Sequence, residues 1–388
     1  MNPLAPHYSR FRVAERLLLS GHSHQAWPDV GFAAQQQAWL DAAVLVDDKW
    51  EAAAAQAARV RAGFARLLGD DPANIALGQN THELVTRWLS ALPLRDRPQL
   101  VTTTGEFHSL RRQVDRLEED GGLAIVRVEV HPAGTLAERL SAKIANHTAC
   151  VMVSSVLFET AEIVPYLHLV SSACEQHGAA LLVDAYHHLN VVPFDIRATG
   201  LAHAFVTGGG YKYCQLGEGN CFLRVPPGAR LRPVLTGWFA EFDALEESHG
   251  GHRVRYGPGA AAFGGATYDP TSHYRAAAVF DFHVTEGLTP ARLHAVNRAQ
   301  VSRIRTGFER LDADPAVARV EPMDEERRGG FLAIRAPRAA DLSRALKARG
   351  VFTDARGDIL RLGPAPYLDD TQLDDAVDAL AEVLREQA

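Results

Sequence analysis

Through the middle of the chain, short apolar runs alternate with stretches in which apolar residues recur at helical spacing. Apolar runs of this length, rich in β-branched residues, are typical of buried strands, and their alternation with helices is typical of parallel strands. The expected strands are residues 74–77, 99–103, 124–129, 150–156, 180–184, 204–207 and 220–225. The pattern therefore predicts an α/β fold, with a mostly parallel sheet covered by helices on both faces.

Two longer helical patterns frame this region. An Ala-rich stretch over residues 41–68 has apolar positions at helical spacing and ends at Asp70-Asp71-Pro72. A second stretch runs from about residue 274 toward residue 311. It is followed by expected strands at 317–321 and 331–336 and expected helices at 339–349 and 371–385. We interpret residues 41–273 as a large domain and residues 274–388 as a smaller C-terminal α/β domain.

The composition is that of an ordinary globular protein, with 47% hydrophobic and 22% charged residues. A formal net charge of −7 provides no positive field for a phosphate backbone, so we expect no nucleic-acid partner. No apolar run is long enough to cross a bilayer, so we expect no membrane partner either. The four cysteines form no C-x-x-C pair, which favours reduced thiols and a cytoplasmic protein.

The most informative polar residues follow two successive expected strands. Asp184 ends the run 180–184, and Lys212 follows the glycines after residues 204–207. In an open parallel sheet, ligands bind beyond these carboxyl ends. A buried carboxylate can keep a pyridinium nitrogen protonated, and a lysine amine can bind a cofactor aldehyde covalently and then move protons. Alone, Asp184 could cap a helix and Lys212 could be a solvated charge; together they indicate a pyridoxal-5′-phosphate (PLP) site.

A candidate phosphate site precedes them. Residues 78–83 lie between a short strand and a helical stretch, and Asn80 and Glu83 are spaced as a capping pair. A helix N-terminus attracts anions through its free N–H groups and its dipole. A capping pair is more often structural, but with Asp184 and Lys212 downstream it indicates a phosphate cup.

Several segments, in order along the chain, resemble kynureninase, a fold-type I PLP enzyme of the aminotransferase class V group. Asp184-Ala-Tyr-His187 and Tyr211-Lys212-Tyr213 are similar to its D-x-A-H and Y-K-Y segments, and Gly237-Trp238-Phe239 to its G-W-F. Residues 263–267 and 350–367 also resemble family segments, and residues 21–23 stand where the family has G-N-S. The resemblance implies a PLP-binding large domain, with residues 1–40 completing the small domain and the active site.

The resemblance also implies roles for individual residues. Lys212 binds the cofactor, Asp184 pairs with its pyridine nitrogen, and Phe107 lies over its ring. Arg361 holds the substrate α-carboxylate, as the fork geometry of a guanidinium suits. His187 and Tyr211 also contact the cofactor, Tyr211 at its phosphate together with Trp238, and both are candidates for a proton relay. The remaining implied contacts are Thr81, His82, Thr160, Trp238 and Thr267 with the cofactor and Ser23 and Glu241 with the substrate. A homodimer follows, in which Trp238 and Thr267 reach the neighbouring cofactor.

The implied reaction is hydrolytic cleavage of the Cβ–Cγ bond of kynurenine, or of a related aryl-ketone amino acid, to alanine and an aromatic acid, as in tryptophan catabolism. The departures from the family concern the far end of the substrate. Leu110 stands where the family has an acidic residue, and Glu241 replaces a histidine. Leu157-Phe158 replaces N-Y before Thr160. We therefore expect weak activity on kynurenine relative to a 3-hydroxylated or otherwise altered analogue.

Other functions remain open on the sequence. An aminotransferase, a β-eliminating lyase or an epimerase of the same class would use the same cofactor residues. A cysteine desulfurase is disfavoured because no cysteine follows Cys221. A metal hydrolase using His22, His24, His187 and His188 is disfavoured because adjacent histidines on a loop point apart and no carboxylate joins them at helical spacing. A binding protein that keeps the fold without catalysis is the last alternative.

Overall fold

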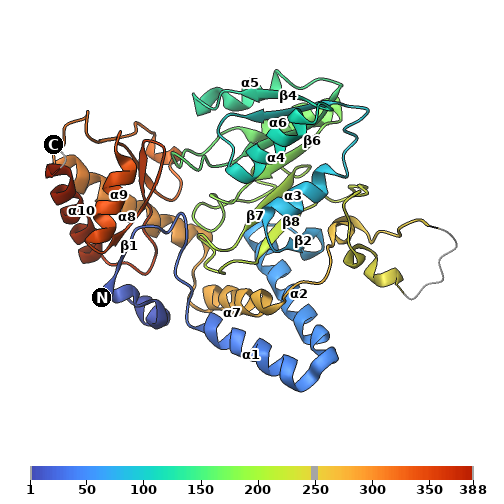
Figure 1. Cartoon of the computed structure of the whole chain (residues 1–388), viewed down its shortest axis with the longest axis horizontal. Helices are drawn as coiled ribbons and strands as arrows, with labels where there is room; N and C mark the ends of the chain where they lie inside the picture. Colours follow the sequence, from blue (N-terminus) through green and yellow to red (C-terminus); the bar gives the residue numbers. More distant parts are fainter. Residues whose placement is uncertain (1, 246–251, 387–388) are drawn as a thin grey trace.

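The computed structural model describes residues 2–245 and 252–386 and is built around a seven-stranded sheet (Figure 1). In spatial order the strands are β2 (Ile75–Gly78), β8 (Cys221–Arg224), β7 (Phe205–Gly209), β6 (Ala180–Asp184), β5 (Thr148–Ser154), β3 (Gln99–Thr103) and β4 (Ala124–Val128). β3 pairs with β4 and β5 in parallel, as do β5 with β6 and β6 with β7. β8 alone runs against its neighbours, β2 and β7. The expected α/β fold with a mostly parallel sheet is confirmed.

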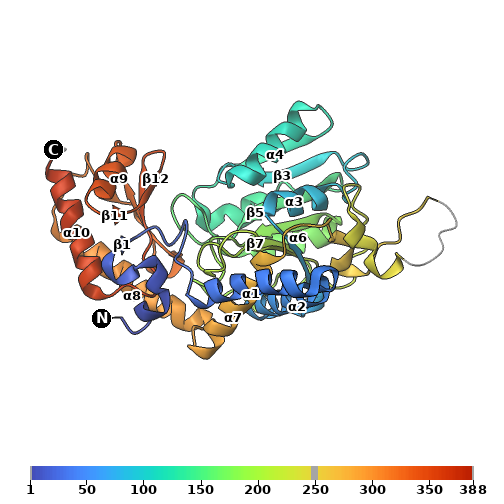
Figure 2. The same cartoon turned by 60° about the horizontal axis from the view of Figure 1, so that its bottom comes forward.

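Both faces of this sheet are buried, because alternate side chains of each strand enter different cores. Val151 and Val153 face a core that includes residues of α2 (Lys49–Leu68), α5 (Leu136–Ser141), α6 (Leu167–His177) and α7 (Thr271–Thr285). Cys150 and Met152 face the opposite core, with α3 (Thr81–Leu89) and α4 (His108–Glu119). Figure 2 shows α2 and α7 below the strands and α3 and α4 above them. All four cysteines are buried and free.

The C-terminal part forms a smaller unit at one end of the molecule (Figure 1). An antiparallel sheet has the order β12 (Asp354–Arg356), β13 (Ile359–Leu362), β10 (Leu332–Arg335) and β9 (Arg319–Val320). The helices are α8 (Pro290–Arg310), α9 (Ala339–Ala348) and α10 (Asp370–Arg385). The N-terminal strand β1 (Leu17–Leu18) pairs in parallel with β11 (Val351–Phe352), and Tyr8 lies in the same core as α10. The N-terminal segment therefore packs on this unit, while the proposed domain bounds stay predictions.

Two expected helices are each broken in the structure. The stretch 41–68 is the end of α1 (Val30–Leu45) followed by α2, and the chain turns between them at Val46, whose φ is +54°. The stretch 274–311 is α7 and α8, separated at Gly287, which has a φ of +63°. Thr289 then caps α8 and Pro290 occupies its first turn, where a missing N–H costs nothing. Short 3-10 helices occupy Ala5–Phe11, Val13–Glu15, Val46–Asp48, Pro72–Asn74, Ala133–Thr135, Trp238–Ala244, Gly259–Phe263 and Glu325–Arg327.

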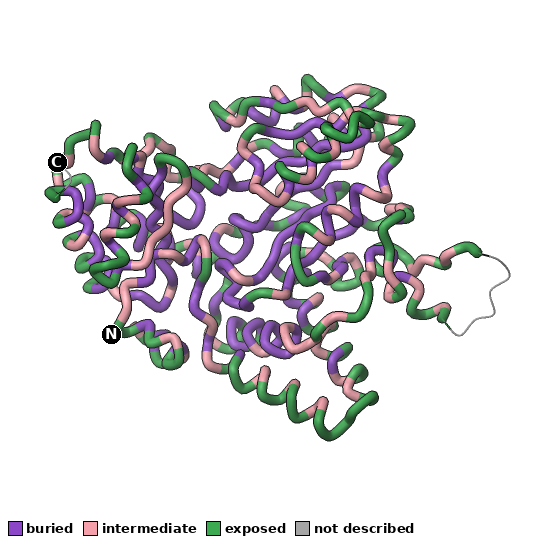
Figure 3. The backbone as a smooth tube through the Cα atoms, in the orientation of Figure 1, coloured by how far each residue is buried: buried purple, intermediate pink, exposed green. Residues whose placement is uncertain are grey.

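Burial is uneven over the molecule. The central strands are buried, whereas the hairpin of α1 and α2 is exposed along much of its length (Figure 3). Trp39 and Val44 on α1 keep 79% and 78% of their surface exposed. None of the helices in the described ranges is both long enough and apolar enough to pass through a bilayer.

Candidate active site

A cavity of about 300 Å³ opens beyond the carboxyl ends of β6 and β7. This volume lies at the lower end of the range found for small-molecule sites. Seven of the residues proposed from the sequence line it: Thr81, His82, Phe107, Asp184, His187, Tyr211 and Lys212. They come from the N-terminus of α3, the turn before α4, and the loops that follow β6 and β7. The two polar clusters after β6 and β7 therefore meet in one cavity, at the sheet edge where ligand binding is expected.

Lys212 is the only buried lysine of the four in the chain. Its Nζ lies 2.6 Å from His187 Nε2 and within 5.6 Å of the ring centroids of Phe107, Tyr186 and Tyr211. Burial among these rings lowers the pKa of Lys212 to about 7, although the charge of Asp184 acts in the opposite direction. A substantial fraction of the amine is therefore unprotonated, and hence nucleophilic, at neutral pH.

His187 shares the lysine's environment and stays neutral. Burial, followed by the positive charge of Lys212, holds the pKa of His187 well below its usual range. A neutral imidazole has one acceptor nitrogen, so Nε2 can accept a hydrogen bond from the Lys212 amine. His187 can therefore orient the Lys212 amine through this hydrogen bond.

Asp184 is the last residue of β6 and is buried. One carboxylate oxygen, Oδ1, accepts a hydrogen bond from the Tyr186 backbone N–H at 2.8 Å. Burial raises the pKa of Asp184, while Lys212 lowers it. A carboxylate removed from water in this way is stabilised by a cation, and a pyridinium nitrogen is such a cation.

The N-terminus of α3 forms another wall of the cavity. The Asn80 side chain accepts a hydrogen bond from the Glu83 N–H at 2.8 Å and so caps the helix. The other half of the expected capping pair is not formed, because the Glu83 carboxylate binds Arg87 instead. Thr81 and His82 are the first residues of this helix and line the cavity, where the helix dipole favours an anion such as a phosphate.

These residues fit PLP. The cavity brings together an amine for the aldehyde carbon, a buried carboxylate for the ring nitrogen, a helix N-terminus for the phosphate and the ring of Phe107 for the ring face. The described residues contain no group of three or more His, Cys, Asp or Glu placed to hold a metal ion. The donor set therefore matches an organic phosphate cofactor.

Arg361, the proposed carboxylate clamp, lies behind the cavity wall. It is 2% exposed, its Nε donates to Asp354 Oδ1 at 2.8 Å, and Nη2 donates to the other oxygen. Nη1 donates to the carbonyl of Phe158, a residue that lines the cavity. His22 Nε2 donates a hydrogen bond to Asp354 Oδ1 at 2.7 Å. Burial lowers the pKa of His22 to about 4, so its ring is neutral. Asp354 thus fixes one edge of the guanidinium.

The remaining proposed residues lie outside the cavity lining. Thr160 is buried and its Oγ1 accepts from the Glu162 N–H, while Ser23 Oγ contacts His24. Trp238 and Thr267 are hydrogen-bonded to each other at 3.2 Å on an exposed surface. Glu241 accepts a hydrogen bond from the Arg255 N–H at 2.7 Å. Among the described residues of one subunit, none of these five proposed residues lines the Lys212 cavity.

Sequence reasoning missed several lining residues. Tyr186 sits within the segment that contains Asp184, and Ser154 ends β5 at the same edge, so the edge rule could have found both. Glu218 and Cys221 enter from the loop before the antiparallel strand β8 and from the first residue of that strand. No motif in the sequence indicates their position, because it depends on the reversed direction of β8.

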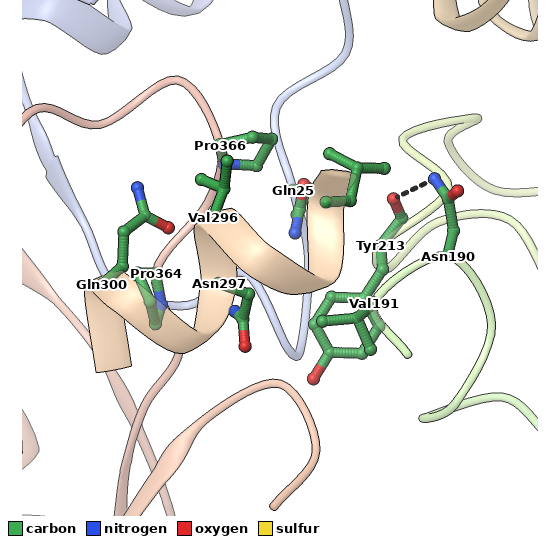
Figure 4. Close-up of a pocket in the computed structure, with 10 residues that line it drawn as sticks. Gln25, Asn190, Val191, Tyr213, Val296, Asn297, Gln300, Pro364 and Pro366 are labelled. Atoms are coloured by element: carbon green, nitrogen blue, oxygen red, sulfur yellow. Dashed lines mark hydrogen bonds between the residues drawn. The ribbon is translucent and has the colours of Figure 1, made fainter. Parts of the chain in front are cut away.

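The loop that carries Lys212 is held in place by contacts of the next residue, Tyr213. A pocket of only about 10 Å³, too small for a substrate, separates Tyr213 from Val296, Asn297 and Gln300 of α8 (Figure 4). Asn190 donates from Nδ2 to the Tyr213 carbonyl at 3.0 Å, as the dashed line in Figure 4 marks. Tyr213, the residue after Lys212, is therefore held beside α8 of the C-terminal unit.

Solved structures share this fold over its whole length. The chain superposes on the cystine C-S lyase C-DES with a TM-score of 0.83 at 15% identity, covering 98% of this chain and 99% of that one. In that structure a glycine is covalently linked to the PLP cofactor. A cysteine desulfurase from Thermococcus onnurineus NA1 gives a TM-score of 0.82 at 17% identity, covering 100% and 99%.

Two family matches account for the site. Residues 43–218 match aminotransferase class-V, and residues 298–380 match the kynureninase C-terminal domain. The first range contains Asp184 and Lys212, and the second contains Arg361. The chain therefore has the fold of class V, fold-type I PLP enzymes, and residues 43–218 match the class V model. Pyridoxal phosphate is accordingly its cofactor, as the sequence predicted.

Relatives of this chain have several activities. An uncharacterised aminotransferase of Bacillus subtilis, YcbU, is 23% identical over 89% of the chain and 88% of its own length. Isopenicillin N epimerase of Streptomyces clavuligerus is 27% identical over 83% of each. Kynureninase of Bacillus cereus is 24% identical over 74% of the chain and 67% of its own length. These names share the cofactor class but differ in the reaction, so they do not identify the reaction of this chain.

Proposed function

We propose that the chain is a kynureninase-like hydrolase, which cleaves the Cβ–Cγ bond of kynurenine or a related aryl-ketone amino acid to alanine and an aromatic acid. The observation that carries the proposal is the match of residues 298–380 to the kynureninase C-terminal domain. That range supplies Arg361 and Asp354, whose ion pair lies directly behind the cavity wall at Phe158. The motifs around Asp184 and Lys212 support the same assignment.

When bound, PLP supplies an electron sink for negative charge at the substrate Cα. Lys212 would hold the cofactor through its amine, and because the pKa of this amine is lowered to about 7, it would also be suited to move the proton of the substrate Cα. His187 Nε2 lies 2.6 Å from Lys212 Nζ, where it would orient the amine and form part of the proposed relay. Tyr211 lines the same cavity and completes the proposed relay toward the ketone.

The α-carboxylate of the substrate is proposed to bind the free edge of Arg361. Asp354 occupies the Nε and Nη2 edge of this guanidinium, so the edge formed by Nη1 and Nη2 retains donors. Phe158 covers this edge through its carbonyl. A substrate carboxylate therefore has to displace that carbonyl from Nη1. It is the stronger acceptor, because a hydrogen bond between two charged groups is stronger than one to a neutral carbonyl.

Subunit sharing is the proposed reason that Trp238 and Thr267 lie outside the cavity. Their hydrogen-bonded pair is exposed, as are the nearby apolar side chains of Val234, Leu235 and Phe242. Trp238 and Phe242 pack together with ring centroids 5.5 Å apart, and exposed apolar side chains that gather in this way are typical of a protein interface. In a two-fold dimer, the pair would complete the cofactor site of the other subunit, and Glu241 on the same 3-10 helix would approach its substrate.

The second candidate is an aminotransferase or epimerase of the same class. The relatives with these names cover more of the chain than the B. cereus kynureninase does. Lys212, Asp184 and Arg361 would have the same roles, since all these reactions begin with proton removal at Cα. A β-eliminating lyase shares that first step too.

Identification of products from a substrate panel tests the proposal. Purified holoenzyme is incubated with kynurenine, 3-hydroxykynurenine and common amino acids, and the products are separated and weighed by mass spectrometry. We expect alanine and the aromatic acid in equal amounts, with 3-hydroxykynurenine or another ring-altered ketone preferred. A keto acid, or an inverted Cα without cleavage, would replace the proposal by the second candidate.

A further inference from the structure

A second carboxyl group is buried next to the cofactor site and has no role in the proposed mechanism. Glu106 follows β3 and is 3% exposed. Its Oε1 accepts a hydrogen bond from Thr103 Oγ1 at 2.6 Å and one from the Ser154 backbone N–H at 3.2 Å. Its Oε2 accepts from Ser154 Oγ at 2.6 Å. Three donor atoms of two residues, each at the end of a strand, thus hold one carboxyl group.

The hydrogen bonds around Glu106 favour its ionised form. The Thr103 hydroxyl oxygen already accepts from the Gly105 N–H at 3.1 Å, so its single proton is available for Glu106. Ser154 can supply both a hydroxyl proton and an amide proton. All three partners therefore act as donors, and a group that accepts three hydrogen bonds is suited to be a carboxylate.

Glu106 is also close to Asp184 through Ser154. Ser154 ends β5, lines the cavity and is the register partner of Asp184 on β6. Burial raises the pKa of Glu106 to about 7, and the charge of Asp184 contributes to this increase. Neither carboxyl group forms a salt bridge with a lysine or arginine in the described part of the chain. Two buried carboxyl groups thus lie at neighbouring strand ends, and among the described residues neither is paired with a lysine or arginine.

Other ionisable groups at this end of the cavity do not supply the missing charge. Burial raises the pKa of the Cys221 thiol to about 12, so it is neutral. Lys212 interacts electrostatically with Asp184, but its amine is the group that binds the cofactor aldehyde. Ser154 and Thr103 are uncharged. The cation that suits both carboxylates is the protonated ring nitrogen of the cofactor.

We propose that Glu106 is a positioning residue that acts with Asp184 to keep the pyridine nitrogen of PLP protonated. Thr103 and Ser154 hold its carboxylate beside Asp184, where it adds a second negative charge to the environment of the ring nitrogen. A more firmly protonated ring is a stronger electron sink. Glu106 therefore sets the strength of the sink for whichever class V reaction follows.

The test measures the ring nitrogen directly, without a substrate, so its outcome is independent of the proposed hydrolase activity. Holoenzyme is loaded with PLP labelled with ¹⁵N in the ring, and the nitrogen chemical shift is followed against pH. In Glu106→Gln, the amide keeps acceptor oxygen and volume but removes the charge. We expect the proton affinity of the ring nitrogen to fall about tenfold, which corresponds to one pKa unit.

Matched variants separate charge from structure. Glu129→Gln makes the same change at an exposed carboxylate after the neighbouring strand β4 and should leave the titration unchanged. Ser154→Ala removes one donor from Glu106 and should shift the ring nitrogen in the same direction as Glu106→Gln, by a smaller amount. If Glu106→Gln fails to bind PLP, the titration of the ring nitrogen in Ser154→Ala tests the proposal instead. A wild-type titration curve in Ser154→Ala, or in a folded Glu106→Gln, would overturn the proposal.

Discussion

The reactivity of Lys212 follows from its burial rather than from its residue type. Lys49, Lys143 and Lys347 all retain solvent contact, and only Lys212 lies among aromatic rings next to a neutral imidazole. Removing water penalises the ammonium form, and this lowers the pKa.

The first prediction is a pH profile for PLP capture by the apoenzyme. The pKa of Lys212 is lowered to about 7, so the reactive amine predominates above that pH and is protonated below it. We expect the rate of capture, followed by visible absorbance, to rise with pH and reach half its maximum near pH 7. A midpoint near that of an ordinary lysine, about pH 10, would show that burial does not activate this amine.

At Arg361 the sequence predicted the residue but not its surroundings. The segment ending in Arg361-Leu-Gly-Pro-Ala-Pro-Tyr367 resembled a family segment, whereas its ion pair with Asp354 and the contact of His22 depend on the folding of β12 against β13. Glu106 was missed for a similar reason: its partners lie at two strand ends that only the folded sheet brings together. Residues that directly follow a parallel strand could be predicted to lie near the cavity. Residues whose position depends on a hydrogen-bond or ion-pair partner from another strand could not.

Arg361→Ala gives the second prediction. Loss of a charge-assisted contact of about 2–3 kcal/mol should lower kcat/KM by roughly 30- to 150-fold, and by a similar factor for every amino acid tested. Arg338→Ala, at an arginine whose side chain is 62% exposed, is the control. A loss confined to substrates with one kind of side chain would show that Arg361 recognises the far end instead of the α-carboxylate.

Among the elements, α3 contributes both to stability and to the candidate cofactor site. Asn80 caps its N-terminus at the cavity, so the same side chain that stabilises the helix also fixes the N–H groups proposed to bind the phosphate. The existence of most elements could be predicted from apolar spacing. The breaks at Val46 and Gly287 could not be predicted. The helical spacing of apolar residues continues across Val46, and a single glycine such as Gly287 is tolerated inside many helices.

Asn80→Ala is the third prediction. It should cost about 1 kcal/mol of stability and also weaken PLP binding. The control is Thr289→Ala, which removes the equivalent cap of α8 in the C-terminal unit. Thermal unfolding should report a similar loss in both variants, whereas PLP titration should report weaker binding only in Asn80→Ala. Equal PLP affinity in the two variants would remove α3 from the phosphate site.

At the scale of the whole molecule, the exposed apolar surface suggests that the subunit is incomplete. Val234 is 81% exposed, and Trp39 and Trp238 are 79% and 45% exposed, although large apolar side chains are usually buried. The fold and the cofactor were predictable from the order of strands and motifs. The location of Trp238 and Thr267 outside the cavity was expected only through the family's dimer, which stays a prediction.

The fourth prediction is complementation between subunits. Lys212→Ala and Trp238→Ala should each be nearly inactive as homodimers. After subunit exchange, half of the dimers are mixed, and one of their two sites has both native residues, so about a quarter of wild-type activity should return. Mass spectrometry of intact dimers verifies the exchange. Exchanged dimers without recovered activity would show that Trp238 serves its own subunit or neither.

The central claim is that the cavity beyond β6 and β7 binds PLP through Lys212. The most direct measurement is peptide mapping by mass spectrometry after borohydride has fixed the cofactor to its amine. We predict the reduced pyridoxyl group on the peptide containing Lys212, and none in Lys212→Ala. Attachment at Lys49, Lys143 or Lys347, or an unchanged yield of fixed cofactor in Lys212→Ala, would contradict the account.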